Sequence, residues 1–245
     1  MAHRGGAKVP QLRGLENTMA AFRHAVGLGY RYLETDVHAS SDGELFIMHD
    51  ARLDRVCDRV GSIAELTATD IEGVRIGGSE PIPRLTDLLE EFPELRVNID
   101  IKAPTAVAPL VSVLDRMNAY DRVCVGAFDE ERIVEFRRAT GGKVATSAAR
   151  SETIRFLLSR RDEGRAFLAR SGISVLQLPR VRGPIPVVRP WLVRRAHAAG
   201  VHLHVWTVDR AGQMEAMIDA GVDGIFTDRT DVLKDVLSRG GLWRE

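Results

Sequence analysis

The stretch ETDVHASSDGELFIMHD occupies residues 34–50 and predicts a strand, a tight turn and a return strand. Because side chains alternate along a strand, Glu34 and Asp36 leave the same face. Asp42-Gly43 is a hairpin turn signal, and the segment between the two strands is too short for a parallel crossover. The return strand is therefore antiparallel, and we expect it to bring His49 roughly opposite Asp36.

The two carboxylates need a partner if the face that carries them is enclosed. Glu34 and Asp36 repel each other there, and burial removes the water that stabilises their charges. A divalent cation is the simplest compensation, and a hairpin with a solvated face is the alternative. This hairpin is the predicted centre of a functional site.

Outside the hairpin, strand-like and helix-like segments alternate. Strands are predicted near residues 2, 33, 98, 124, 145, 176, 204 and 225. Helices are predicted over residues 16–28, from an N-cap at Thr86 to residue 92, and over 105–118, 130–139, 151–170, 190–200, 211–220 and 230–238. This alternation favours an α/β fold of the (β/α)8 TIM-barrel type over an open doubly wound sheet. An open sheet would usually carry a glycine-rich nucleotide loop after its first strand, and Gly5-Gly6 lacks the full spacing.

The barrel is predicted to be a single domain over residues 1–245. The hairpin rises above its second strand. Residues 51–84 form a small insertion with a short helical piece near residues 62–66. A long irregular insertion of this kind is typical of a substrate-facing loop.

The first strand is short, because only Met1-Ala2 precedes His3. A closed barrel leaves no free sheet edge, so each strand must fill a slot. We expect residues 1–4 to lie between the strands near Leu33 and Ile225, above a poorly sealed end of that slot. A true start upstream or a locally weak barrel would account for such a gap.

The bulk composition excludes several functional classes. With 34 Lys+Arg against 34 Asp+Glu, the chain has no global attraction to nucleic acid or to an anionic membrane, although a local basic patch is compatible with this balance. Cys57 and Cys124 lack metal-site spacing and form no disulfide framework, which fits a reduced, cytoplasmic compartment. The chain opens without an apolar signal region, and no run approaches about 18 apolar residues, so stable membrane insertion is not expected.

The barrel prediction locates the site, since catalytic groups of such barrels sit at the C-terminal ends of the strands. Polar side chains are predicted there at His3, Arg4, Glu34, Asp36, Asp100, Lys102, Gln177, Trp206 and Asp228, with His49 and Asp50 above them on the hairpin. The three carboxylates on adjacent strands predict a hard-oxygen site for Mg²⁺ or Ca²⁺. Lys102 and Arg4 indicate an anionic ligand, of which phosphate fits best. A plain ion pair between Asp100 and Lys102 is the alternative.

Two histidines flank this acidic cluster in the predicted site. In-line displacement at phosphorus needs one proton removed from the attacking group and one given to the leaving group. Imidazole suits both tasks near neutral pH, so we expect His3 and His49 to share them. A catalytically inactive barrel that only binds a ligand is a third hypothesis, and the presence of both histidines beside all three acids argues against it.

The order and spacing of these residues resemble the glycerophosphodiester phosphodiesterase family of the PLC-like phosphodiesterase TIM-barrel superfamily. The resemblance is carried by His3-Arg4-Gly5, Glu16-Asn17-Thr18, Glu34-x-Asp36-Val37, Asp42-Gly43, His49-Asp50 and residues 98–102, 205–208 and 221–228. It implies a TIM barrel that hydrolyses glycerophosphodiesters to glycerol 3-phosphate and an alcohol. It implies a divalent cation on Glu34, Asp36 and Asp100, which would be Mg²⁺ or Ca²⁺, with Mn²⁺ as a further candidate. It implies proton transfer by His3 and His49 and phosphate contact by Arg4 and Lys102. Glu16 would support His3 or the metal, and Trp206 would form an aromatic wall beside the substrate.

Two positions depart from the family pattern. The family usually has Glu where this chain has Asp100, and the related spider-venom type phospholipase D enzymes have Asp there. A lysophospholipid or sphingomyelin is therefore the alternative substrate. The Asn that follows the tryptophan motif in the family is Asp209 here.

The remaining histidines and tryptophans offer a second enzyme class. His202 and His204 form a His-x-His pattern like that of metal-dependent amidohydrolases, but in those enzymes the pattern lies on the first strand. We therefore expect both histidines to fill the barrel interior as hydrogen-bond partners. Packing roles are expected for Trp191 and Trp243, and surface or loop positions for His24, His38 and His197.

Overall fold

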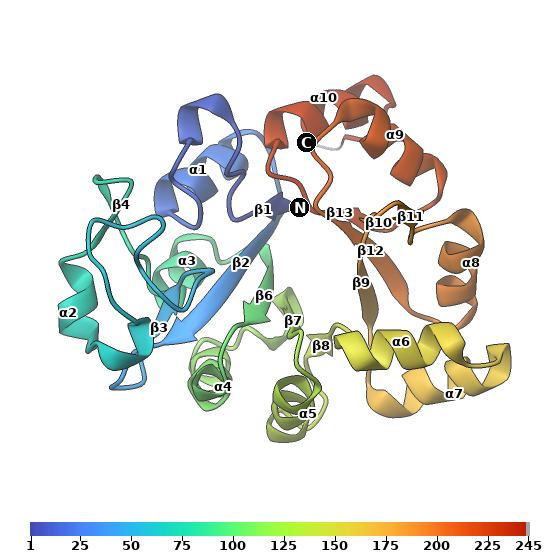
Figure 1. Cartoon of the computed structure of the whole chain (residues 1–245), viewed down its shortest axis with the longest axis horizontal. Helices are drawn as coiled ribbons and strands as arrows, with labels where there is room; N and C mark the ends of the chain where they lie inside the picture. Colours follow the sequence, from blue (N-terminus) through green and yellow to red (C-terminus); the bar gives the residue numbers. More distant parts are fainter. Residues whose placement is uncertain (244–245) are drawn as a thin grey trace.

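Eight parallel strands form a closed ring in the computed structural model, which describes residues 1–243 (Figure 1). In ring order the strands are β1 (Ala2–His3), β2 (Tyr32–Ala39), β6 (Arg96–Ile101), β7 (Val123–Gly126), β8 (Ala145–Thr146), β9 (Val175–Pro179), β12 (His202–Trp206) and β13 (Gly224–Ile225). Two seams of the ring are held by single parallel bridges, Ser147 to Val175 and Ala2 to Thr227. The predicted (β/α)8 barrel is confirmed.

Helices surround this ring and alternate with the strands along the chain, except that α7 follows α6 directly (Figure 1). They are α1 (Met19–Gly27), α3 (Leu85–Glu91), α4 (Val107–Arg116), α5 (Glu130–Ala139), α6 (Arg150–Leu158), α7 (Arg161–Ser171), α8 (Pro190–Ala198), α9 (Ala211–Asp219) and α10 (Thr230–Arg239). Single 3-10 turns lie at Pro10–Leu12, Pro104–Ala106 and Tyr120–Arg122. No helix among residues 1–243 is long and apolar enough to cross a bilayer.

Two of the predicted helices differ from the observed ones. The helix predicted over residues 151–170 is two helices, because Ser159 and Arg160 adopt extended conformations between α6 and α7. The Arg195 guanidinium of α8 donates to the carbonyls of Phe156 and Ser159 at 2.6 and 2.7 Å, which satisfies the end of α6 from outside. Helix α3 begins at Leu85, before the predicted N-cap.

The start of α3 is capped by an acid inside the helix. Arg84 holds the N-cap position, and its backbone N–H donates to the Asp87 carboxylate at 3.0 Å. The helix start is thus marked by a carboxylate inside the first turn that reaches back to the N-cap N–H, and the Thr86 signal was misplaced.

The hairpin exists, with its register shifted by one residue from the prediction. Strand β3 (Leu45–Ile47) runs antiparallel to β2, with Val37 opposite Ile47. The Met48 N–H donates to the Asp36 carbonyl at 3.0 Å, so Met48 rather than His49 lies opposite Asp36. The turn from Ser40 to Glu44 fixes this register, because Ser40 and Glu44 bond to each other through backbone and side chain.

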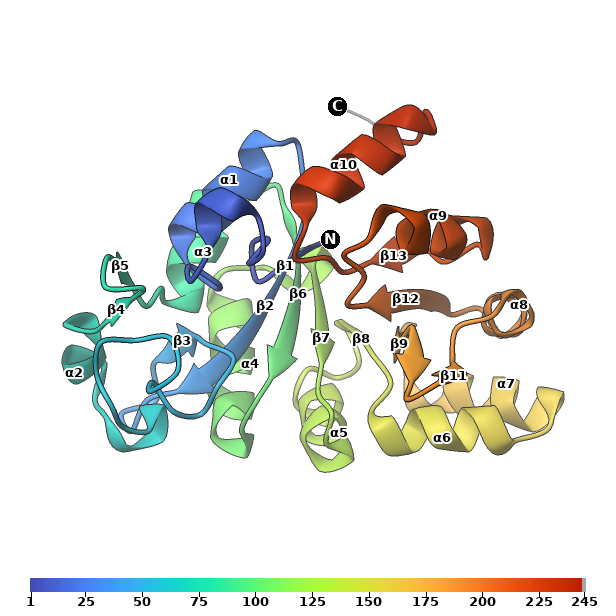
Figure 2. The same cartoon turned by 45° about the horizontal axis from the view of Figure 1, so that its top comes forward.

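Residues 51–84 are a compact layer on the outside of β3 (Figure 2). They contain a 3-10 turn at Ile63–Glu65, near the predicted helical piece, then α2 (Ala68–Glu72) and the strand pair β4 (Arg75–Ile76) and β5 (Glu80–Pro81). The layer has its own core, formed by Phe46, Met48, Leu53, Ile63, Ala68, Ile71, Val74, Ile76 and Ile82. Burial of these apolar side chains stabilises an insertion that sequence patterns predicted as an irregular loop.

The barrel has an apolar outer face and a polar inner face. Leu33 on β2 and Ile99 on β6 point outward and are fully buried under the helices. Inside, the Gln177 amide donates to Asn98 at 2.6 Å. A Cβ at Gly126 would lie 2.8 Å from the Ser147 hydroxyl, so this interior position has room for glycine alone. Polar contacts therefore reach into the barrel interior.

Residues 1–4 lie in the predicted slot. Ala2 pairs with Leu33 on one side and bridges Thr227 on the other. Ala2 is fully buried, and a Cβ on Gly224 would lie 2.5 Å from the end of the Met1 side chain. These first two residues therefore fill the end of the slot that was expected to be poorly sealed.

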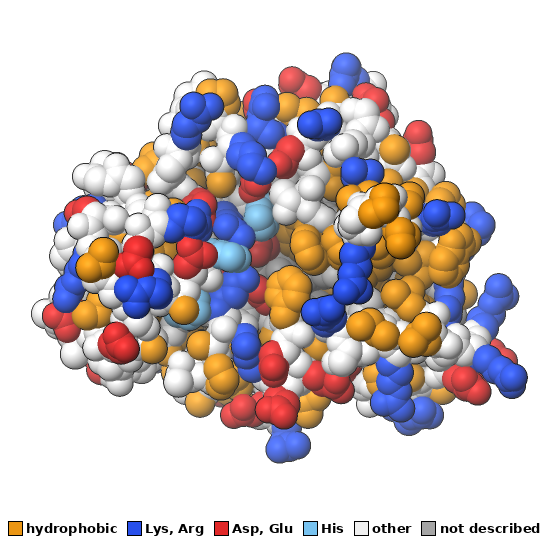
Figure 3. All heavy atoms as spheres, in the orientation of Figure 1, with side chains coloured by type: hydrophobic (Ala, Val, Ile, Leu, Met, Phe, Trp, Pro, Cys, Tyr) orange, Lys and Arg blue, Asp and Glu red, His pale blue; other side chains and the backbone are white. Residues whose placement is uncertain are grey.

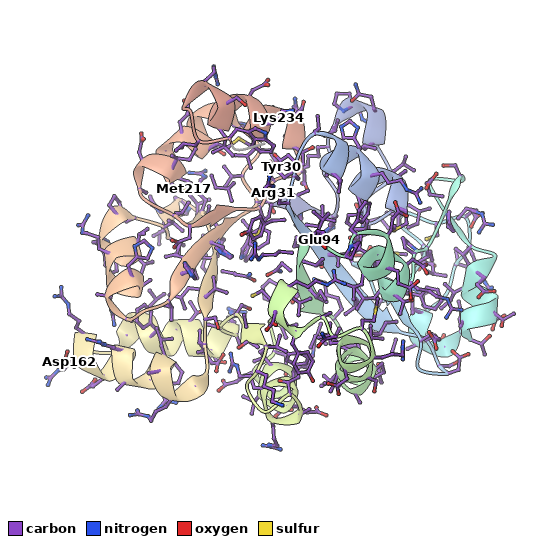
Figure 4. The ribbon with its side chains drawn as sticks, turned by 180° about the vertical axis from the view of Figure 1, so that it is seen from behind. Tyr30, Arg31, Glu94, Asp162, Met217 and Lys234 are labelled. Carbon is purple, nitrogen blue, oxygen red and sulfur yellow. The ribbon has the colours of Figure 1, made fainter. Side chains whose placement is uncertain are left out.

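The outer seam beside this slot is closed by an aromatic contact. The Tyr30 hydroxyl donates to the Thr230 carbonyl at 2.8 Å, and the Tyr30 ring meets Trp243 edge-on at 5.0 Å. Lys234 covers the other part of the Trp243 ring at 5.7 Å. Figure 4 shows Tyr30 and Lys234 on neighbouring elements at this seam, seen from behind. Trp243 is a packing residue, as predicted.

Several secondary predictions fail. His202 is largely exposed and lies 3.3 Å from Asp223, and Trp191 is also exposed, because both sit at the ends of elements rather than inside them. His38 is buried within β2, where its Nε2 meets the His49 carbonyl at 3.2 Å. His197 is exposed on α8, as expected.

His204 points into the barrel, and its Nδ1 is buried without a hydrogen-bond partner among residues 1–243. Burial lowers the pKa of His204 to about 4. An unfolded histidine takes up its proton near pH 6.5, so between these values the unfolded state binds the extra proton. Stability must then fall as the pH falls.

We predict that His204→Leu reduces this acid sensitivity. Between pH 7 and pH 4.5, His204 should lower the free energy of unfolding of the wild type by about 2 kcal/mol, and the variant should not show this loss. Urea unfolding at a series of pH values measures it. The control Leu203→Val, on the same strand, leaves every titratable group in place and should keep the wild-type slope. Equal slopes in wild type and His204→Leu would contradict the prediction.

Candidate active site

His3 lies at the C-terminal end of β1 and is hydrogen-bonded to Asp228, near the other end of the sequence. Its Nδ1 is 2.5 Å from the Asp228 carboxylate, and its Nε2 is 3.8 Å from the Glu34 carboxylate. Asp228 is held in turn by the Lys8 ammonium at 2.8 Å. Burial alone would lower the pKa of His3, but Glu34 and Asp228 outweigh burial and raise it above 6.5.

His49 follows β3 and has a carboxylate partner of the same kind. Its Nδ1 is 2.6 Å from the Asp50 carboxylate, whose other oxygen accepts from Arg55. Against the effect of burial, Arg55 and His49 lower the pKa of Asp50 to about 2, so this partner is ionised at neutral pH. His49 directly follows Met48, whose N–H donates to the Asp36 carbonyl at 3.0 Å. The hairpin therefore brings His49 next to the strand that carries Glu34 and Asp36, although the register prediction was off by one residue.

The two histidines thus share one arrangement. A carboxylate on Nδ1 fixes the proton-bearing nitrogen and the ring orientation, which leaves Nε2 for chemistry. Asp228 does this for His3, and Asp50 does it for His49. The arrangement can give a proton at one atom and take one at another.

The three predicted acids lie together on β2 and β6. Asp36 and Asp100 are register partners on the two strands, and Glu34 precedes Asp36 on the same face. Lys102 bridges the pair, with its ammonium 2.8 Å from Asp36 and 2.6 Å from Asp100. The ion pair between Asp100 and Lys102, which was the alternative interpretation of the sequence, is therefore present and includes Asp36.

Arg4 and Asn17 hold the other side of this cluster. Arg4 adopts a left-handed conformation with φ of 50°, which places its backbone N–H 3.1 Å from the Glu34 carboxylate and its Nε 3.4 Å from Asp36. Asn17, also left-handed with φ of 59°, donates to Asp36 at 3.0 Å. The next residue, Gly5, has to be a glycine, because a Cβ there would lie 2.6 Å from the Ala21 Cβ of α1. These backbone demands explain the His-Arg-Gly and Glu-Asn-Thr segments.

Glu16 supports Arg4 rather than His3. Its carboxylate accepts from Arg4 at 3.0 Å and from both terminal nitrogens of Arg55 at 2.6 and 2.9 Å. Arg55 belongs to the insertion, and it also bonds to Asp50. A continuous chain of ionic hydrogen bonds therefore joins Arg4 to His49 through Glu16, Arg55 and Asp50.

The charges of the acidic cluster are incompletely balanced. Burial raises the pKa of Glu34 to about 7, and the neighbouring Asp36 and Asp100 add to this effect. Burial also raises the pKa of Asp100. Lys102 and Arg4 outweigh burial at Asp36 and lower its pKa. Two of the three carboxylates thus resist ionisation, a sign of a site that fits additional positive charge.

These donors fit a hard cation in chemistry, but they are not preassembled around one. No group of three His, Cys, Asp or Glu side chains in residues 1–243 stands in a metal-binding arrangement. Instead, the Lys102 ammonium lies between Asp36 and Asp100. Binding a cation through all three carboxylates requires Lys102 to move aside.

An aromatic pair lines the mouth next to this cluster. Trp206, at the end of β12, meets Phe128 edge-on at 5.8 Å. The Lys102 ammonium lies 5.8 Å from the Phe128 ring, and 59% of Phe128 is exposed. Figure 3 shows a hollow near the middle of this face, with histidine, basic and acidic side chains along one edge. The hollow has one charged side and one aromatic side.

Sequence reasoning missed the roles of four residues in this site. Asp228 and Asn17 were noted only by position or motif, and Arg55 and Phe128 were not noted. Asp228 lies just beyond the eighth strand, and a polar residue in that position is the signal that could have identified its role. Arg55 and Phe128 carry no such signal, since their positions depend on how loops fold back.

Comparisons with known proteins agree with this geometry. The model of the glycerophosphoryl diester phosphodiesterase family matches residues 3–232. The chain is 42% identical over 245 residues to a protein of Mycobacterium tuberculosis named "Probable glycerophosphodiester phosphodiesterase 2", covering 99% of this chain and 92% of that one. It is 30% identical over 257 residues to the glycerophosphodiester phosphodiesterase of Caldanaerobacter subterraneus, covering 98% of each.

Solved structures share the fold. A glycerophosphodiester phosphodiesterase from Parabacteroides distasonis matches with a TM-score of 0.77 and 25% identity, covering 98% of this chain and 96% of that one. A phosphodiesterase of Oleispira antarctica, solved with its product sn-glycerol-3-phosphate, matches with a TM-score of 0.79 and 21% identity, covering 97% and 95%. From the family match over most of its length, the chain belongs to the glycerophosphoryl diester phosphodiesterase family and is a phosphoric diester hydrolase.

Proposed function

We propose that this chain hydrolyses glycerophosphodiesters to glycerol 3-phosphate and an alcohol by proton transfer through His3 and His49. The observation that carries the proposal is the matched pair of histidines, each with a carboxylate on Nδ1, beside buried acids and two cationic side chains. The Oleispira antarctica relative holds sn-glycerol-3-phosphate, the product expected here.

Members of this family are typically metal-dependent, and we assign the cation to Glu34, Asp36 and Asp100. Mg²⁺ or Ca²⁺ suits an all-oxygen donor set best, with Mn²⁺ as a third candidate. When bound, such an ion polarises the phosphoryl oxygens and stabilises the charge that develops on them. Arg4 and Lys102 would then hold the remaining phosphate oxygens, since both side chains already lie at the acids.

His3 and His49 would perform opposite proton transfers at their Nε2 atoms. Asp228 and Asp50 keep each ring in one orientation, which reduces the entropy lost on reaching the reactive geometry. Trp206 and Phe128 would exclude water from the side of the substrate that faces them. A cytoplasmic location is part of the proposal and is supported by Cys57 and Cys124, which are both free thiols.

A lysophospholipid or sphingomyelin remains the alternative substrate, because Asp100 stands where the family usually has Glu. A shorter side chain leaves more room beside the cation. Product analysis separates the two classes directly.

The first prediction for the reaction concerns its products and its metal dependence. With Mg²⁺, Ca²⁺ or Mn²⁺, phosphorus NMR of a panel of glycerophosphodiesters and lysophospholipids should show glycerol 3-phosphate released from the former. Chelation should abolish the activity, and returning one of the cations should restore it, because burial raises the pKa of Glu34 and of Asp100 and only added positive charge would hold both carboxylates ionised. Full activity in excess chelator would overturn the metal assignment, and products from lysophospholipids alone would favour the alternative substrate.

The second prediction concerns the histidines. His3→Ala and His49→Ala should each lower kcat by about 10²–10⁴-fold, the usual contribution of a positioned acid or base. His197→Ala, on the outside of α8, is the matched control and should keep wild-type kinetics. Circular dichroism checks that each variant is folded. An active His49→Ala enzyme would remove His49 from the mechanism.

The third prediction concerns Lys102. Lys102→Met removes the ammonium between Asp36 and Asp100, so calorimetric titration should show tighter cation binding. The same variant should lose about 10²-fold in kcat even when saturated with metal, because a phosphate contact is gone. Lys143→Met, at an exposed lysine, is the control. Near wild-type kinetics would leave Lys102 as a structural ion-pair residue.

A further inference from the structure

One stretch of this electrically balanced chain has no acidic residue. The chain as a whole has equal numbers of basic and acidic side chains, 34 of each. Between Glu163 and Asp209, however, it has no Asp or Glu and seven arginines, at positions 165, 170, 180, 182, 189, 194 and 195. The neutral total therefore conceals a local concentration of positive charge.

The structure gathers part of this charge on a small hairpin. The hairpin consists of β10 (Val181–Arg182) and β11 (Ile185–Pro186), and α8 begins soon after it. Arg182 and Arg189 are exposed. Within residues 1–243, neither they nor Arg180 and Arg194 take part in any ion pair. By contrast, Arg195 is committed to the carbonyls at the end of α6.

Large apolar side chains are exposed between these arginines. Ile185, at the start of β11, is 64% exposed, and Trp191, in the first turn of α8, is 49% exposed. Over β10, β11 and the start of α8, Figure 3 shows hydrophobic and basic side chains without acidic ones among them. We call Arg180, Arg182, Ile185, Arg189 and Trp191 the rim surface.

The rim surface adjoins the mouth of the barrel. The Arg180 N–H donates to the Trp206 carbonyl at 3.2 Å, and the Val187 N–H donates to the Arg180 carbonyl at 3.0 Å. These bonds fix the base of the hairpin to the strand end that carries Trp206. The hairpin therefore rises from the aromatic side of the mouth.

We propose that the rim surface docks the protein on anionic lipid headgroups at a membrane surface. Unpaired arginines match the phosphates of anionic lipids, and each basic residue near such a surface increases partitioning about fivefold. Tryptophan gains by entering the headgroup layer, where both its apolar ring and its polar N–H are satisfied, and isoleucine gains by burying its apolar side chain at the boundary with the acyl chains. A nucleic acid would also attract the arginines, but its phosphate backbone gives nothing to an exposed isoleucine.

Docking in this orientation turns the mouth toward the bilayer. The phosphodiesterase site would then meet substrates whose phosphodiester belongs to a membrane lipid or has just left one. This consequence rests on the proposed function, whereas the docking itself does not.

Co-sedimentation of the full-length protein with lipid vesicles tests the proposal. The protein should bind vesicles of phosphatidylcholine mixed with phosphatidylglycerol, and binding should weaken as salt is added. It should not bind vesicles of phosphatidylcholine alone. The double variant Arg182→Glu/Arg189→Glu should bind at least about tenfold more weakly. Ile185→Ser/Trp191→Ser should also bind more weakly, at unchanged net charge.

The matched control is Arg165→Glu/Arg170→Glu on α7, which changes the net charge equally at two exposed arginines away from the hairpin. It should retain wild-type binding. Absence of wild-type binding to anionic vesicles, an equal loss in this control, or binding to a DNA fragment but not to vesicles would overturn the proposal. Hydrolysis of a soluble glycerophosphodiester, unchanged in all these variants, reports on the proposed function separately.

Discussion

The site depends on keeping several carboxylates close together at the buried ends of two strands. Sheet pairing itself places Asp36 beside Asp100, so their repulsion cannot be relieved by moving apart. Lys102 and Arg4 supply positive charge, yet the pKa of Glu34 stays near 7 because burial dominates there. The left-handed backbone of Arg4 and Asn17 exists to bring donors to this cluster. The barrel therefore holds mutually repelling carboxylates in place, and a bound cation or phosphate would change the net charge around them.

The insertion after β3 takes part in this balance although it lies outside the ring of strands. Arg55 contacts Glu16 and Asp50 at once, so one side chain couples the phosphate-facing Arg4 to the orientation of His49. The apolar core of the insertion holds Arg55 in place. Changes inside that core can thus reach the chemistry without touching a catalytic group.

The sequence predicted those features that follow from the alternation of side chains along a strand and from the position of strand ends. Alternation along β2 put Glu34 and Asp36 on one face, and the barrel rule placed the mouth correctly. Contacts between distant parts of the chain were not predictable, such as His3 with Asp228, because no local pattern records them. The break between α6 and α7 is of the same kind, since it depends on Arg195 arriving from α8. The Lys102 side chain lies between two acids because of their charges, and the spacing of residues along a strand does not reveal this position.

The seam between the first and last strands of the barrel lies directly beside the proposed catalytic His3. The ring closes between its first and last strands through a single bridge from Ala2 to Thr227, and the next residue on each side is a member of the His3–Asp228 pair. A fluctuation that opens this seam separates the imidazole from its carboxylate while the rest of the ring stays intact. The geometry of this histidine therefore depends on local closure of the ring between its two ends as well as on the global stability of the barrel.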